Sequence, residues 1–183
     1  MKYSKAALGG TFDHFHNGHK TLINHALSVA KTVVVGVTDA KLVKHKALSD
    51  VIESFDMRLN SLKSFARDIR ATDRIDIVKL NDIFGPTLVD ENIDVLVVSP
   101  LTERGASTIN NARIGRNLPD LPVEVCALEA ANDGDHISST RIRLGEIDRE
   151  GFVYVSLFEQ DIVADEELKR HVRPPMGELI RNS

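Results

Sequence analysis

A stretch near the N-terminus carries the residue types that bind phosphate. It reads GGTFDHFHNGHK and spans residues 9–20. A short apolar run at 6–8 precedes it, and apolar residues at helical spacing follow it from Leu22. Glycines let the backbone approach a ligand closely, and the free N–H groups and dipole of a helix start favour an anion. His16 and His19 add ring N–H donors, so the stretch predicts a phosphate site with imidazoles directed at it.

A second run with similar chemistry lies far along the chain, where residues 137–143 read ISSTRIR. Ser138 is a good helix N-cap, which leaves open N–H groups on Ser139 and Thr140 in the first turn. Arg143 lies four residues after Ser139, so it faces the same side of the helix and can make bidentate phosphate contacts. Taken alone, a plain capped helix with a solvent-facing arginine explains this pattern better.

The composition indicates one globular domain. The chain has 183 residues, of which 42% are hydrophobic and 27% charged. We expect a cytoplasmic protein without a signal peptide or membrane helix, because no apolar run approaches about 18 residues. Cys126 is the single cysteine and is expected to be an inert core residue. The net charge of −4 disfavours a general nucleic-acid binder, so a polyphosphate site must gather its basic residues locally.

Strand-like and helix-like segments alternate, which predicts an α/β fold: a Rossmann-like, doubly wound parallel sheet of about five strands with helices on both faces. The expected strands are 5–8, 32–38, 75–80, 93–99 and 123–128, and the expected helices are 17–31, 55–70, 87–91, 105–117 and 138–147. Ligands in such sheets bind at the carboxyl ends of the strands. That rule places four segments together at the carboxyl edge of the sheet: 9–19, 38–46, 99–105 and the loop before Ser138.

An HxGH motif between a strand and a helix resembles the signature of the nucleotidyltransferase superfamily. Together with ISSTRIR, the full string at 9–20 is similar to the phosphopantetheine adenylyltransferases of archaea and of the fused eukaryotic enzyme. Residues 81–87 resemble that family's D-P-Y-G-P-T loop, with Ile83 in place of its proline, and 99–105 resembles its nucleotide-packing segment. The bacterial branch has an arginine directly after that strand, and this chain has none. The resemblance runs from about residue 5 to 151.

The resemblance implies a reaction in which ATP and 4′-phosphopantetheine give dephospho-coenzyme A and pyrophosphate. An ionised acceptor phosphate attacks the α-phosphorus in line, so no general base and no covalent intermediate are needed. A Mg²⁺ ion carried by ATP is expected as the cofactor. Asp13 is expected to brace the loop by accepting backbone N–H bonds rather than to bind metal, and no residue is assigned as a metal ligand.

The resemblance also implies the residues that do the work. His19 is the expected catalytic donor, together with Lys41 or Lys44, between which the spacing does not choose; Lys46 also fits the archaeal and eukaryotic spacing. Expected ATP and phosphate contacts are Gly9, Gly10, Thr11, Phe12, His16, Arg104, Ser138, Ser139, Thr140 and Arg143. Expected phosphopantetheine contacts are Thr11, Lys44 and Arg58, although Met57 departs from the family pattern before that arginine.

Two other functions remain open at this point. One is a relative with another base or acceptor, such as a cytidylyltransferase or a nicotinamide mononucleotide adenylyltransferase. The other is a non-catalytic module that binds a nucleotide or coenzyme A. A monomer is expected, as in the archaeal branch. Residues 1–151 form the expected nucleotidyltransferase domain and 152–183 an extension, in which 168–180 resembles the opening of a GTP-dependent dephospho-coenzyme A kinase.

Overall fold

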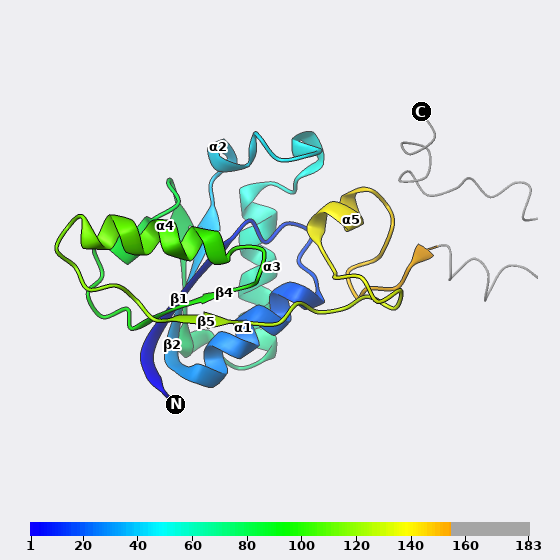
Figure 1. The fold of residues 1–183 in the computed structure, drawn as a ribbon. Coiled ribbons are helices and arrows are strands. Elements are labelled where there is room, and N and C mark those ends of the chain that lie inside the picture. The colour runs from blue at the N-terminus through cyan, green and yellow to red at the C-terminus, as the bar shows by residue number, and fades with distance from the viewer. Residues whose placement is uncertain (155–183) are drawn as a thin grey trace, which may run out of the picture.

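Five parallel strands form one sheet in the order β3-β2-β1-β4-β5 in the computed structural model, which describes residues 1–154 (Figure 1). The strands are β1 (Tyr3–Gly10), β2 (Ala30–Thr38), β3 (Ile75–Leu80), β4 (Val95–Val98) and β5 (Val123–Val125). The chain moves outward from β1 to β3 and then crosses to the other side of β1. This reversal creates a topological switch point between β1 and β4, where ligands bind in such sheets. The expected fold class is confirmed.

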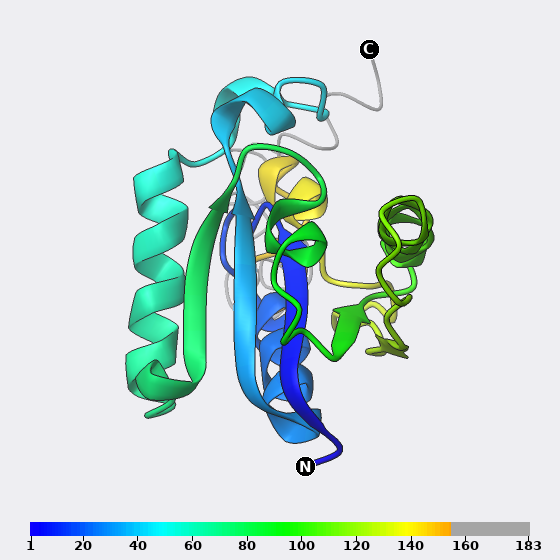
Figure 2. The same cartoon turned by 90° about the vertical axis from the view of Figure 1, so that its left-hand side faces the viewer.

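Helices cover both faces of the sheet. They are α1 (Asn17–Val29), α2 (Ala40–Val43), α3 (Phe55–Asp68), α4 (Glu103–Ile114) and α5 (Ser139–Arg143), with 3-10 turns η1 (Ser49–Val51), η2 (Thr72–Arg74) and η3 (Gly85–Leu88). Figure 1 shows α1 and α4 on opposite sides of the sheet. Figure 2 shows α2 and α5 at the end of the sheet away from the N-terminus, near the carboxyl ends of β1 and β2.

The main core lies between the sheet and the face covered by α1 and α3. Ile23 of α1 and Leu62 of α3 pack there against Val33 and Val35 of β2, and all four are almost fully buried. Successive valines of β2 are buried on both of its faces, as expected for an inner parallel strand. The opposite face is lined mostly by small residues of β1 and β2, and a separate, smaller apolar cluster joins β1 and β4 to Ala106 of α4.

Some expected elements are shorter than the sequence pattern suggests. The helix expected at 138–147 ends at Arg143, because Gly145 takes a left-handed backbone conformation with φ of +68°. The strand expected at 123–128 ends at Val125, and the residues after it turn toward the site. The turns α2, η1 and η2 were not expected.

Cys126 is buried as expected, and burial raises the pKa of its thiol. The described residues contain no helix long and apolar enough to cross a membrane. Most of the 152–183 extension, with its kinase-like stretch at 168–180, lies outside the described residues, so that expectation stays a prediction.

Candidate active site

The loop between β1 and α1 is held in an unusual backbone conformation. Phe12 and His14 both have positive φ, at 55° and 46°, which is rare for residues other than glycine. The ring of Phe12 is 1% exposed and anchors the loop in the core. The backbone N–H of His14 donates to the carboxylate of Glu53, at 2.8 Å. The loop conformation is therefore fixed by packing and by a hydrogen bond from the turn before α3.

The two histidines of the HxGH motif stack on each other at the start of α1. The ring centroids of His16 and His19 are 3.8 Å apart. The Nδ1 atom of His19 accepts a long bond, 3.4 Å, from the backbone N–H of His16, which leaves Nε2 of His19 to carry the proton. Phe12 and Phe15 flank the His19 ring. His19 is thereby oriented as an N–H donor.

Both histidines are uncharged at neutral pH. Burial lowers the pKa of His16 to about 4. Burial, helped by the neighbouring His16 and Lys46, holds the pKa of His19 well below its ordinary value. The neutral ring of His19 can therefore offer its N–H to a phosphate oxygen, while the positive charge of the site must come from lysine and arginine.

Lys46 supplies one of these charges. Its ammonium lies 2.6 Å from the hydroxyl oxygen of Thr11, just beyond the end of β1. Burial lowers the pKa of Lys46, and the nearby charges of Arg143 and Arg58 act in the same direction. Because Lys46 lies close to other cations, a bound anion such as a phosphate would stabilise its charge.

The second motif meets the first through Asp13. An Asp13 carboxylate oxygen accepts from the guanidinium of Arg143 at 2.5 Å, and the pair is almost fully buried. Its other oxygen accepts the backbone N–H of Glu53 at 2.8 Å, so Asp13 braces the loop as expected. These bonds hold the pKa of the carboxyl below its ordinary value despite the opposing effect of burial.

The guanidinium of Arg143 is only partly hydrogen-bonded within the described residues. Its terminal nitrogens bond Asp13 and the hydroxyl of Thr140, but its buried Nε has no hydrogen-bond partner among residues 1–154. Ser139 donates its hydroxyl to the carbonyl of Asp13 at 2.8 Å and lies 3.3 Å from Nε2 of His16. Because the serine proton is already used, His16 must be the donor in that contact.

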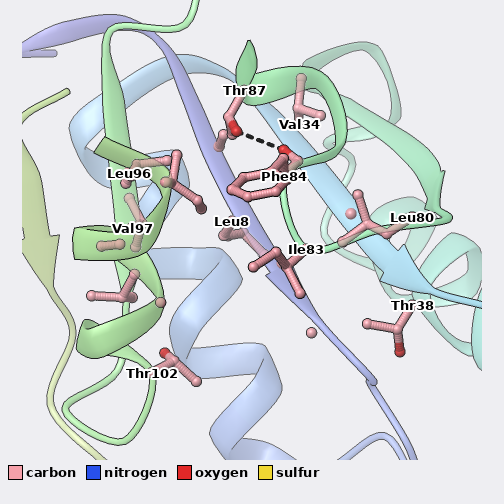
Figure 3. Close-up of a pocket in the computed structure, with 18 of the residues that line it drawn as sticks. Leu8, Val34, Thr38, Leu80, Ile83, Phe84, Thr87, Leu96, Val97 and Thr102 are labelled. Carbon is pink, nitrogen blue, oxygen red and sulfur yellow. Dashed lines mark hydrogen bonds between the residues drawn. The ribbon is translucent and has the colours of Figure 1, made fainter. Parts of the chain in front are cut away.

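Three cavities meet at these groups. One, of about 320 Å³, is lined by Thr11, Asp13, Lys46, Ala47, Ser139, Thr140 and Arg143 and is rich in polar groups. A second, of about 220 Å³, extends from the histidines toward residues 126–129 after β5. A third, of about 270 Å³ and mostly apolar, lies against the face of the sheet near α4 and η3 (Figure 3). Thr11 and Lys46 line all three.

Comparison with known proteins decides the family. Residues 7–145 match the model of the cytidylyltransferase-like family. The chain is 40% identical over 147 residues to a phosphopantetheine adenylyltransferase of Methanopyrus kandleri, which covers 80% of this chain and 92% of that protein. The chain belongs to the phosphopantetheine adenylyltransferase family.

Other members of the phosphopantetheine adenylyltransferase family show the same relation. The protein of that name from Methanothermobacter thermautotrophicus is 40% identical over 152 residues, covering 83% of this chain and 90% of that protein. The one from Saccharomyces cerevisiae is 34% identical over 78% of this chain and 48% of its own length. Among solved structures, a protein of unknown function from Archaeoglobus fulgidus superposes with a TM-score of 0.59 and 28% identity, over 67% of this chain and 97% of that one.

This member of the phosphopantetheine adenylyltransferase family brings together most of the residues singled out in its sequence. The residues that line one or more of the three cavities are Gly9, Gly10, Thr11, Phe12, His16, His19, Ser138, Ser139, Thr140 and Arg143. Ser138 also caps α5, because its hydroxyl oxygen accepts the backbone N–H of Arg141. What these residues bind is not tested by their placement, so their roles stay predictions.

Four expected residues lie elsewhere. Lys41, Lys44 and Lys46 are all exposed residues, but Lys41 and Lys44 line none of the three cavities, whereas Lys46 lines all of them. Arg104 is exposed on α4, also away from the cavities. Arg58 is 1% exposed.

Arg58 joins backbone segments instead of facing a cavity. It donates to the backbone carbonyls of Thr11, Thr38 and Glu53 at 2.7, 2.9 and 3.0 Å. The guanidinium therefore ties the ends of β1 and β2 to the turn before α3, and its expected contact with phosphopantetheine stays a prediction.

Sequence reasoning missed Glu53. Its backbone and side chain hold Asp13, His14 and Arg58, and its carboxylate also pairs with Arg149 at 2.7 Å. A single glutamate gives no signal of this role, since Asp13, His14 and Arg149 come from distant parts of the chain.

Proposed function

We propose that the chain transfers the adenylyl group of ATP to 4′-phosphopantetheine, giving dephospho-coenzyme A and pyrophosphate. The observation that carries the proposal is the meeting, at Thr11 and Lys46, of the apolar cavity and the cavity that extends from the histidines. A transferase needs this arrangement, because its two substrates must approach from different directions and meet at the reacting phosphorus.

The apolar cavity suits the acceptor. It lies on the sheet face between α4 and the η3 turn, with Leu96, Phe84 and Ile109 among its walls. A long, thin arm of amide and methylene groups could lie along it with its phosphate at Thr11 and Lys46. Residues 83–87, which resemble the family's D-P-Y-G-P-T loop, form part of this cavity.

The second cavity suits the nucleoside of ATP. Its far walls are Leu101 and Thr102 before α4 and residues 126–129 after β5. Adenine carries no charge, so backbone groups and apolar side chains of this kind can hold it. The triphosphate would then run past the histidines to Ser139 and Arg143.

Catalysis in this arrangement is positioning and charge stabilisation. An acceptor phosphate oxygen forms a bond to the α-phosphorus while the bond to the bridging oxygen breaks, and pyrophosphate leaves as an anion. His19 and Lys46 donate to the equatorial oxygens, where charge builds up in the transition state. Ser139, Thr140 and Arg143, which line the polar cavity, hold the departing pyrophosphate.

Mg²⁺ enters with ATP in this proposal. Within residues 1–154, Asp13 is the one carboxylate that lines the polar cavity, and its oxygens are bonded to Arg143 and to the backbone of Glu53. The lining of the polar cavity therefore fits a metal carried on the phosphates better than one held by the cavity's own residues.

We also propose that the enzyme acts as a cytoplasmic monomer.

The deciding experiment measures dephospho-coenzyme A formed from phosphopantetheine with ATP or CTP. We expect ATP to be preferred at least about tenfold, or roughly 1.4 kcal/mol. Equal turnover of CTP would favour a cytidylyltransferase. Turnover with nicotinamide mononucleotide in place of phosphopantetheine would favour a nicotinamide mononucleotide adenylyltransferase. Tight nucleotide binding without any product would favour a non-catalytic module.

A further inference from the structure

Leu80 stands at the carboxyl end of β3 and lines the apolar cavity (Figure 3). It is 7% exposed. It contributes no polar group, and it lies in none of the motifs that carry the family resemblance. Its position is nevertheless determined by an unusual set of neighbours.

Three glycines from different elements surround the Leu80 side chain. A Cβ atom on Gly36 of β2 would lie 2.7 Å from Cδ1 of Leu80, and one on Gly9 of β1 would lie 3.3 Å from the same atom. A Cβ atom on Gly85 of η3 would collide with Cδ2 of Leu80. Carbon atoms do not approach as closely as 2.7 Å, so the leucine occupies space that any other residue at 36 would take.

The leucine is consequently sunk into the face of the sheet. A methyl group at position 36 would have to push the isobutyl group of Leu80 away from β2, and the cavity is the open space beside it. The neighbouring positions on this face, Ala7 and Gly9, are also small. The small residues leave the apolar cavity open as a channel along the sheet, and Leu80 forms the wall of this channel on the side of β3.

This wall lies near the phosphate end of the channel. Leu80 pairs in register with Thr38 on the adjacent strand, and neighbouring strands lie about 4.8 Å apart. The hydroxyl oxygen of Thr38 is in turn 3.5 Å from that of Thr11, where the acceptor phosphate is expected. In phosphopantetheine, the branched dimethyl carbon directly follows the phosphomethylene, so it is the part of the arm that would pass this wall.

We infer that Leu80, held by Gly9, Gly36 and Gly85, sets the width of the channel beside the acceptor phosphate and so selects the arm that passes it. The inference rests on the proposed function, since it assigns the apolar cavity to phosphopantetheine. It makes Leu80 a specificity-determining residue that contacts the acceptor, and it makes Gly36 a positioning residue that acts through Leu80.

The test is a mutant cycle on positions 36 and 80, with kcat and KM measured separately for both substrates. Gly36→Ala should raise the KM for phosphopantetheine about tenfold or more and change the KM for ATP less than about twofold. In the Leu80→Ala background the same substitution should cost less than about twofold, because the displaced side chain is gone. Leu80→Ala should also improve the relative use of an acceptor homologue with ethyl in place of one methyl of the dimethyl group.

Gly115→Ala is the matched control. It adds the same methyl group after α4, where the nearest atom is 3.5 Å away, and should leave both KM values unchanged. If Gly36→Ala folds poorly, Gly9→Ala makes a milder contact with the same leucine, and its acceptor affinity can be measured by titration calorimetry.

The outcomes distinguish failure of the proposed function from failure of the inference about Leu80. A wild-type protein that forms no dephospho-coenzyme A overturns the proposed function and this inference with it. An active wild-type protein in which Gly36→Ala costs the same with and without Leu80 overturns the inference alone. Loss of acceptor affinity that depends on Leu80 supports both.

Discussion

Asp13 and Arg143 form an ion pair, 2.5 Å between carboxylate oxygen and guanidinium nitrogen, that joins the loop before α1 to the last residue of α5. The two residues are 130 positions apart. Asp13 is fully buried and accepts from one terminal nitrogen of Arg143, while the hydroxyl of Thr140 accepts from the other. The Asp13 carboxylate therefore orients the Arg143 side chain toward the polar cavity and does not itself bind the substrate.

Arg143→Ala should weaken binding of ATP and pyrophosphate, because the triphosphate contacts this residue already in the ground state. It should also lower the free energy of unfolding by about 3–5 kcal/mol, since it leaves the Asp13 carboxylate buried without its partner. Asp13→Asn combined with Arg143→Ala should recover part of the stability but none of the affinity. Denaturant titration and ATP titration of the three proteins separate the effects; full recovery of ATP binding in the double variant would contradict the assignment.

Lys46→Ala should lower kcat roughly 100-fold, because it removes a charged donor from the point where the cavities meet. Lys41→Ala and Lys44→Ala are matched controls of the same charge change on the same segment, and both should stay within about twofold of wild type. Steady-state kinetics with saturating substrates checks this. A large loss of kcat in either control, with Lys46→Ala near normal, would return the role to the lysines first expected.

His19→Ala should lower kcat by roughly 10²–10³ and leave ATP affinity nearly unchanged, if the ring donates only to the transition state. The measurement is single-turnover product formation together with an independent ATP titration. His25→Ala, on the same helix but outside the three cavities, is the control. A His19 variant with near-normal kcat would remove the residue from the mechanism.

Stability should fall in mild acid through His16. Its ordinary pKa of 6.5 applies to the unfolded chain, and burial lowers the pKa to about 4 in the native protein. Between those pH values the unfolded chain binds a proton that the native chain does not, so the free energy of unfolding should decrease as pH falls from about 6.5 to 4. The residue contributes at most about 3 kcal/mol to this decrease.

Denaturant unfolding at a series of pH values measures that dependence. His16→Gln should flatten the slope between pH 6.5 and 4, whereas His45→Gln, at an exposed position, should keep it. An unchanged slope in His16→Gln would show that the ring is not the titrating group.

The sequence pattern was sufficient for the fold because each element has a local cause. The valines of β2 can be buried on both faces only within a parallel sheet, and the apolar stripe of α3 needs a sheet to pack on. The motifs at 9–20 and 137–143 each lie at the start of a helix, and both were expected at the same edge of the sheet. Helix and strand ends near the site were less predictable, since Gly145 ends α5 through a backbone angle that composition does not reveal.

The choice among neighbouring basic residues could not be made locally. Lys41, Lys44 and Lys46 differ only by their place in a turn, and α2 decides which of them reaches Thr11. Arg58 was expected to contact the substrate because of its resemblance to a family pattern at the start of a helix. Its actual partners are carbonyl groups of two other strand ends, a tertiary relation with no sequence signature.

The position of β1 has a consequence during protein synthesis. It pairs with β2 soon after it is made, but its other edge waits for β4, at residues 95–98. A nascent chain emerges N-terminus first, so a central strand stays open for most of that interval and can pair with other chains. ATP cannot protect this intermediate, because the groups that would grip its phosphates are complete only when α5 has left the ribosome. A chaperone that covers the open edge of β1 would therefore act before any nucleotide can bind.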